Sequence, residues 1–158
     1  LLETAIKAGH PDIVDMLLDR GAKPDSYHLR VAAKEGDVRI VKSILDKLGD
    51  DQRVELLLNA PSRNVDEKRA IGRAAKKGHT DVVRLLLDRG ADPDIRDGNG
   101  RNRNMNPILF AARYGHVETV RLLCERGADM FAYLDNEDYD CGEVYDVAKA
   151  NEHPGVME

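Results

Sequence analysis

Short apolar stretches with helical spacing recur along the chain and are separated by glycines. The clearest example spans residues 70–94. A segment of small residues, Ala70–Lys77, ends at Gly78, and a second segment, Thr80–Arg89, carries valines and leucines on one wide face. Each segment is too short to form a stable helix alone in water. The pattern therefore predicts pairs of short helices that pack against copies of the same unit.

Copies of this unit are present along the chain. A five-residue motif recurs: an alanine, a second apolar residue, two variable residues and a glycine. Its glycine stands at positions 9, 36, 78 and 115, and a decayed fifth copy spans residues 148–153. A segment rich in valine, isoleucine or leucine follows each of these four glycines, and three of the segments end in Gly-Ala. This recurrence predicts a stacked repeat array.

Proline and glycine indicate where the predicted helices begin and end. Pro11 suits a first helical position because its φ is already fixed, so we expect later second helices to begin at the equivalent Val38, Thr80 and Val117. The four glycines are expected to have positive φ. We expect the apolar stripes of the second helices to pack in the core: Ile13, Val14, Met16, Leu17, Leu18, Ile40, Val41, Ile44, Leu45, Val82, Val83, Leu85, Leu86, Leu87, Val120, Leu122 and Leu123.

The recurring segments A-A-x-x-G-H and L-L-L-x-x-G-A-D resemble the ankyrin repeat over nearly the whole chain. The best copy of the family's T-P-L-H-x-A start is Asn106–Ala111, which lacks the histidine. The resemblance implies an all-α solenoid of stacked helix-turn-helix units with short β-hairpin or loop fingers. It would form a single domain over residues 1–158, with repeats near 1–25, 26–48, 67–97 and 104–130, a helical insertion at 49–66 and a partial repeat at 142–158.

Composition and charge add limits to this interpretation. Hydrophobic residues make up 42% and charged residues 34% of the chain, which is typical of folded rather than disordered proteins. No apolar run approaches the roughly 20 residues of a membrane-spanning helix, so we expect no membrane insertion. The net charge is −5, yet residues 127–158 hold nine acidic residues and one lysine, which leaves a mildly basic remainder.

The cysteines and histidines do not form a pattern of catalysis or metal binding. Cys124 and Cys141 lack metal-site spacing, and we expect Cys124 to be a buried free thiol in a reducing compartment, hence an intracellular location, cytoplasmic or nuclear. Four histidines share one register position, which indicates a structural role as hydrogen-bond partners of the inter-helix loops: His10, His79, His116 and His153.

Known catalytic and ligand motifs are missing from the sequence. There is no nucleophile elbow and no phosphate-binding loop. The acidic segment at 135–143 has the wrong offsets for an EF-hand, and it is interpreted as a solvated finger or a docking surface for a basic partner. We therefore expect no enzyme activity, no cofactor, no metal and no small-molecule substrate.

A column of cations is the main candidate site. The first variable position of the repeated motif is basic in four successive units, and we call these residues the cation column: Lys7, Lys34, Lys76 and Arg113. In the ankyrin family this position faces the concave groove. Lys77, Arg30, Arg73, Phe110 and Tyr114 lie near the column, and Arg96, Arg101 and Arg103 of a finger could extend it. Such a stripe would attract an acidic peptide, a phosphorylated segment or a nucleic-acid backbone. The alternative is ordinary solvating side chains.

The family resemblance implies non-catalytic recognition of another protein through the groove and fingers, and the cation column favours an acidic partner segment. A second hypothesis is a targeting arm of a larger multidomain enzyme or effector. A third is a nucleic-acid-binding module, against which the acidic end of the chain counts. A fourth is a structural spacer without a groove ligand.

Overall fold

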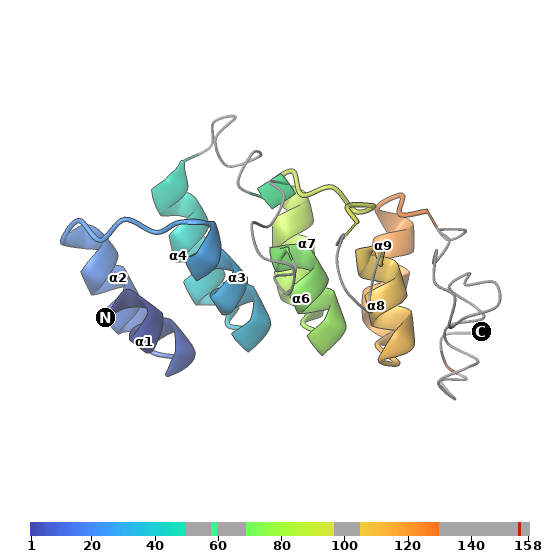
Figure 1. Cartoon of the computed structure of the whole chain (residues 1–158), viewed down its shortest axis with the longest axis horizontal. Helices are drawn as coiled ribbons and strands as arrows, with labels where there is room; N and C mark the ends of the chain where they lie inside the picture. Colours follow the sequence, from blue (N-terminus) through green and yellow to red (C-terminus); the bar gives the residue numbers. More distant parts are fainter. Residues whose placement is uncertain (50–57, 60–68, 97–104, 130–154, 156–158) are drawn as a thin grey trace.

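The computed structural model describes residues 1–49, 58–59, 69–96, 105–129 and 155. Within these ranges the helices form four pairs (Figure 1): α1 (Leu2–Lys7) with α2 (Pro11–Asp19), α3 (Ser26–Glu35) with α4 (Val38–Leu48), α6 (Ala70–Lys77) with α7 (Thr80–Asp88), and α8 (Pro107–Arg113) with α9 (Val117–Glu125). Most of the predicted insertion at 49–66 and of the predicted partial repeat at 142–158 lies outside the described residues.

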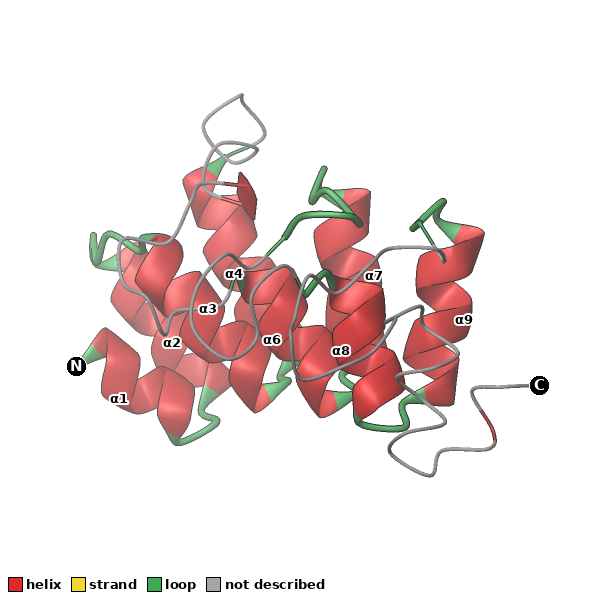
Figure 2. Cartoon of the chain, turned by 45° about the vertical axis from the view of Figure 1, so that its right-hand side comes forward, coloured by secondary structure: helices red, strands yellow, loops and turns green. Residues whose placement is uncertain are grey.

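The helices are arranged in two layers. The first helices of the pairs, α1, α3, α6 and α8, lie side by side, and each contacts the next (Figure 2). The second helices, α2, α4, α7 and α9, do the same. We call these the inner and outer layers. Each pair packs against the next along the stack, which is the architecture of a helical repeat solenoid and confirms the predicted fold class.

Small residues bring the inner helices close together. The alanine pairs of the repeated motif are almost completely buried in the second, third and fourth helical pairs: Ala32, Ala33, Ala74, Ala75, Ala111 and Ala112. The outer helices cover these alanines with larger buried side chains such as Ile44, Leu86 and Leu123. The core is therefore one continuous, mainly aliphatic layer that runs between the two helix layers.

Local sequence accounts for the helix ends. Asp37 is the N-cap of α4: its carboxylate accepts hydrogen bonds from the backbone N–H groups of Arg39 and Ile40, which stabilises the start of the helix. The predicted starts at Val38, Thr80 and Val117 are confirmed. The glycines at 9, 36, 78 and 115 have φ of 67°, 87°, 73° and 73°, so the expectation of positive φ is also confirmed.

The prediction of burial is wrong for two side chains. Ile13 and Met16 on α2 are 44% and 43% exposed, whereas most of the other expected core side chains are buried. The reason is the position of α2 at one end of the stack. Each later outer helix packs against the outer helix before it, whereas no described outer helix precedes α2 to cover Ile13 and Met16. None of the described helices is both long and apolar enough to cross a bilayer.

Candidate functional site

Two histidines join neighbouring helical pairs. The His79 ring donates from Nε2 to the carbonyl oxygen of Lys34 at 3.0 Å, and His116 makes the same bond to Lys76 at 3.0 Å. Each ring lies so close over the glycine of the preceding pair, Gly36 or Gly78, that a Cβ there would come within 2.5 Å of it. The structural role predicted from the shared register is confirmed for these two histidines, which we call the histidine bridges.

The histidine bridge is absent at the first joint. Asp37 occupies the histidine register of the second pair, and its carboxylate caps its own helix. An added Cβ at Gly9 would meet nothing within 4 Å. His10 is exposed, and its ring has no hydrogen-bond partner among the described residues; His153 lies outside the described residues.

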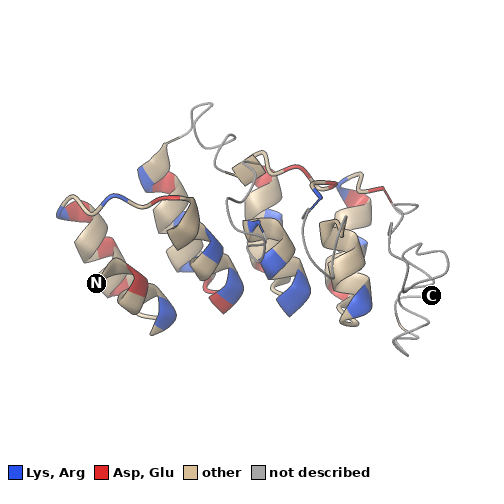
Figure 3. Ribbon diagram, in the orientation of Figure 1, with Lys and Arg blue, Asp and Glu red and all other residues tan. Residues whose placement is uncertain are grey.

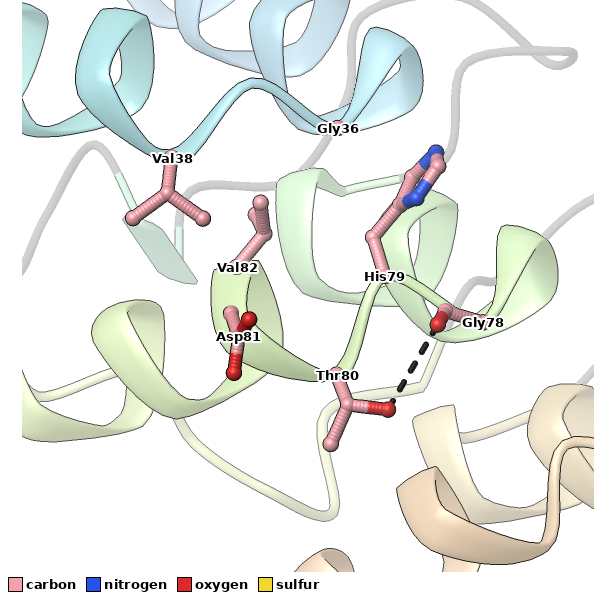
Figure 4. Close-up of a pocket in the computed structure, with 7 residues that line it drawn as sticks. All are labelled: Gly36, Val38, Gly78, His79, Thr80, Asp81 and Val82. Atoms are coloured by element: carbon pink, nitrogen blue, oxygen red, sulfur yellow. Dashed lines mark hydrogen bonds between the residues drawn. The ribbon is translucent and has the colours of Figure 1, made fainter.

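A hollow of about 330 Å³ lies beside the bridge between the second and third pairs (Figure 4). It is lined by Gly36, Val38, Gly78, His79, Thr80, Asp81 and Val82. The imidazole already bonds to a backbone carbonyl, and Thr80 donates to the Gly78 carbonyl at 3.4 Å. The lining therefore offers no set of converging catalytic groups. Over the part of the chain that the structure describes, no three His, Cys, Asp or Glu side chains are grouped to hold a metal ion.

Cys124 does not have the environment of a reactive thiol. It is free and half-buried, so it is less buried than the sequence predicted. Burial raises the pKa of the thiol, which keeps it protonated at neutral pH and weakens it as a nucleophile.

The first half of the cation column is neutralised locally. Lys7 donates to the carboxylate of Glu3 at 2.6 Å, and the Tyr27 hydroxyl donates to the same carboxylate at 2.5 Å. These two bonds, that of Lys7 first, lower the pKa of Glu3. Lys34 contacts Glu35 at 3.2 Å. Two of the four cations in the column are therefore already paired with a carboxylate of the same helix. Figure 3 shows acidic residues beside basic ones on α1 and α3.

The second half of the column has a different environment. Lys76 lies over the ring of Tyr114, with Nζ 5.0 Å from the ring centroid, a favourable cation–π geometry. Lys77 is exposed, and neither lysine forms an ion pair with another described residue. Tyr114 is 42% exposed. Arg113, half-buried, directs Nη1 toward the Met105 sulfur at 3.8 Å and has a further interaction.

The remaining predicted site residues are separated from this group or lie outside the described ranges. Arg30 donates to the Ser26 hydroxyl at 3.1 Å on its own helix. Arg96 is exposed in the finger after α7, and its carbonyl accepts a bond from Arg69. Arg101 and Arg103 lie outside the described residues.

Family models of the ankyrin repeat match residues 29–133 as three copies and residues 1–29 as one further repeat. This chain belongs to the ankyrin-repeat family. Its repeats are of a kind that serves as a protein-interaction module, with extended surfaces formed by stacked units.

Several curated relatives share the repeats. The human tRNA endonuclease ANKZF1 is 35% identical over 101 residues, 64% of this chain. An ankyrin repeat-containing protein of Treponema pallidum is 34% identical over 98 residues, 59% of this chain, and human ankyrin repeat and KH domain-containing protein 1 is 33% identical over 105 residues, 63% of it. The matches span only 12%, 30% and 4% of those proteins.

The ankyrin fingers are held by a polar network that the sequence did not reveal. The Asn59 side chain donates to the Gly90 carbonyl at 3.2 Å and accepts from the Asp92 N–H at 3.0 Å. Asp94 accepts from the Asn106 amide at 3.3 Å and from the backbone N–H of Asp129 at 2.8 Å. The inserted segment and two successive fingers are thereby tied together. The sequence contained one signal for this, since asparagine and aspartate recur where the fingers begin and end.

Ion pairs also join successive ankyrin repeats along the outer layer. Arg89 reaches back to Asp46 at 2.5 Å and Arg126 reaches back to Asp88 at 2.6 Å. The two arginines occupy the same register position, as do the two aspartates. We call these pairs the outer ion-pair ladder. Between the first two repeats Arg39 instead contacts Asp12, at 3.1 Å.

Proposed function

We propose that this ankyrin array is a protein-recognition module that binds an acidic segment of a partner over the inner helices of its third and fourth repeats. One observation carries the proposal: Lys76 and Lys77 have no carboxylate partner among the described residues, whereas Lys7 and Lys34 have Glu3 and Glu35. A cation without a carboxylate partner gains more from an incoming carboxylate, because it gives up no existing ion pair.

Tyr114 adds an anchor beside the two lysines. Its ring is partly exposed and is fixed beneath Lys76, so a partner side chain can pack on it with little loss of rotamer freedom. Tyrosines of this kind often dominate the binding energy of an interface. The full predicted surface also includes Lys34, Arg113, Arg30 and Arg96, which we assign to its less important margin. Arg101 and Arg103 belong to the same prediction but lie outside the described residues.

The test is capture of partners followed by charge reversal. The 158-residue protein is used to capture proteins from lysate, and the bound segments are mapped by limited proteolysis and mass spectrometry. We expect the mapped segment to be acidic and its affinity to fall at least about 10-fold for Lys76→Glu/Lys77→Glu, since two attractions of roughly 1 kcal/mol each become repulsions.

A matched control carries the same charge change on the outer layer. Lys42→Glu/Lys47→Glu alters two exposed lysines of α4 and should leave the affinity within about twofold, because its charges lie on the other helix layer. Equal losses for the two variants would show a response to net charge alone and would contradict the proposal, as would unchanged binding of Lys76→Glu/Lys77→Glu at low salt. A labelled single-stranded RNA that bound more tightly than the mapped peptide would favour the nucleic-acid hypothesis instead.

A second candidate is recruitment for a larger polypeptide. It rests on the comparison in which the matched stretch spans 12% to 30% of the first two relatives. In that arrangement the array would bring a partner to an activity located elsewhere in the same chain. Deleting the array from the full-length protein would then abolish partner binding and leave the activity on a free substrate unchanged.

A further inference from the structure

The first outer helix exposes two apolar side chains at positions where every later repeat buries or half-buries its residue. Ile13 is 44% exposed, whereas its register equivalents Ile40, Val82 and Thr119 are at most 1% exposed. Met16 is 43% exposed, whereas its last equivalent, Leu122, is 2% exposed and the two between them are half-buried. In the fourth repeat the register position of Ile13 faces the preceding outer helix, since the hydroxyl of Thr119 on α9 hydrogen-bonds to that of Thr80 on α7 at 2.8 Å. Each later outer helix likewise contacts the one before it: α4 contacts α2, α7 contacts α4, and α9 contacts α7.

The same face of the first repeat carries two polar groups whose equivalents bind the preceding repeat. His10 shares the register of His79 and His116, which donate to the carbonyls of Lys34 and Lys76. Arg20 shares the register of Arg89 and Arg126, which pair with Asp46 and Asp88. Both His10 and Arg20 are exposed, and neither side chain has a hydrogen-bond or ion-pair partner among the described residues.

These apolar and polar side chains therefore form one surface, whose equivalents in later repeats contact the repeat before them. We define the leading face as His10, Ile13, Met16 and Arg20. At the third and fourth repeats the equivalent set is the interface with the repeat before it in the sequence. The leading face has the same kinds of side chain at the same register positions, and it lies on the same side of its repeat as those interfaces.

We propose that the leading face is a docking surface for one more ankyrin-type helical pair, which precedes α1 in the same polypeptide. This inference is independent of the proposed partner. The occupant must meet the conditions that Gly36, Gly78, Asp46 and Asp88 meet in the later joints. Its inner helix must end in a glycine, because a Cβ would collide with the histidine ring, and its outer helix must be apolar and carry a carboxylate for Arg20.

The coding sequence upstream of the Leu1 codon tests the inference directly. We expect it to encode a small-residue helix that ends in glycine, followed by a segment rich in leucine or valine with Asp or Glu at the register of Asp46 and Asp88. An upstream sequence without such a pair overturns the proposal.

A stability experiment tests the face itself. A copy of residues 69–89, followed by a copy of the connection 21–27, is added before Leu1 so that the register of the array continues. We expect one cooperative unfolding transition with a midpoint raised by about 5 °C or more. Ile13→Lys/Arg20→Glu should cancel this rise in the extended protein, yet change the midpoint of the 158-residue protein by less than about 1 °C, since both side chains are exposed there.

Three results would overturn the proposal. The added pair could unfold in a separate transition, the midpoint could fail to rise, or the double variant could affect both proteins equally. Light scattering of the 158-residue protein at high concentration is the remaining control. A dimer that Ile13→Lys converts to a monomer would identify a second copy as the occupant and contradict an occupant from the same polypeptide.

Discussion

The histidine bridges predict that equivalent glycines of the array differ in their tolerance of a side chain. Gly78 and Gly9 occupy the same register and have nearly the same φ, 73° and 67°. A Cβ at Gly78 would lie 2.5 Å from Nδ1 of His116, whereas a Cβ at Gly9 would meet nothing within 4 Å. Gly9→Ala therefore measures the cost of positive φ alone, and Gly78→Ala measures that cost together with displacement of the imidazole.

The magnitudes follow from these two contributions. Placing alanine at positive φ costs roughly 1–2 kcal/mol, and the loss of unfolded-state entropy offsets part of this equally at both sites. Displacing the His116 ring also breaks its bond to the Lys76 carbonyl, which costs about 1–2 kcal/mol more. We therefore expect Gly9→Ala to lower the free energy of unfolding by roughly 1 kcal/mol and Gly78→Ala by about 2–3 kcal/mol.

Urea unfolding followed by far-ultraviolet circular dichroism provides the measurement, with His116→Ala as the second arm of a double-mutant cycle. In the His116→Ala background the collision is gone, so Gly78→Ala should cost no more than Gly9→Ala does in the wild type. Equal costs for the two alanine variants in the wild-type background would refute the reasoning. Additive effects of Gly78→Ala and His116→Ala would refute it as well, because they would mean that ring and glycine do not interact.

Three further predictions concern polar contacts. Asn59→Ala should lower the free energy of unfolding by about 1–2 kcal/mol, because two hydrogen bonds to the finger are lost; Asn59→Asp, which keeps only the acceptor, should recover part of this in the same assay. Burial raises the pKa of Asp25, but bonds from the backbone and ring of His28 outweigh it and lower the pKa overall. Asp25 caps the start of α3 by accepting a hydrogen bond from the backbone N–H of His28 at 3.1 Å. The stability from this charged cap is fully present above the unfolded pKa, near 4, and is lost as the pH falls through the lower folded pKa. The stability difference between wild type and Asp25→Ala should therefore be constant above about pH 5 and disappear in stronger acid. Arg89→Ala should cost about 1 kcal/mol through loss of the ion pair with Asp46, and the cost should shrink in a salt titration.

The repeated pattern was sufficient to predict much of the fold. Helix starts at Val38, Thr80 and Val117 follow from local chemistry that acts within a few residues, and the positive φ of the glycines follows from the tight turn between two short helices. The structural role of His79 and His116 as hydrogen-bond partners could be inferred from their shared register, but not that each bond reaches the preceding repeat.

Burial and pairing depend on neighbours that the repeated pattern does not contain. Ile13 fits the apolar stripe as well as Ile40 does, but burial requires a helix on the preceding side. Lys7, Lys34 and Lys76 look equivalent in the sequence, yet Glu3 lies one helical turn from Lys7, whereas Lys76 has Tyr114 of the next repeat. The Asn59 bonds join residues more than 30 positions apart, so no local rule identifies them.

Asp37 at the histidine register of the second repeat has a mechanical consequence. The aspartate stabilises its own helix but gives nothing to the repeat before it, so the first joint lacks a histidine bridge. It is held by packing, by the hydrogen bond from the Tyr27 hydroxyl to Glu3 and by an exposed ion pair of Arg39 with Asp12. In a chain of nearest-neighbour couplings, the weakest coupling sets where strain is released. Under tension applied to the two ends of the described array, the first helical pair would detach as a unit while the other three stay stacked. The array would then extend in a defined step and keep the surface around Lys76 and Tyr114 intact.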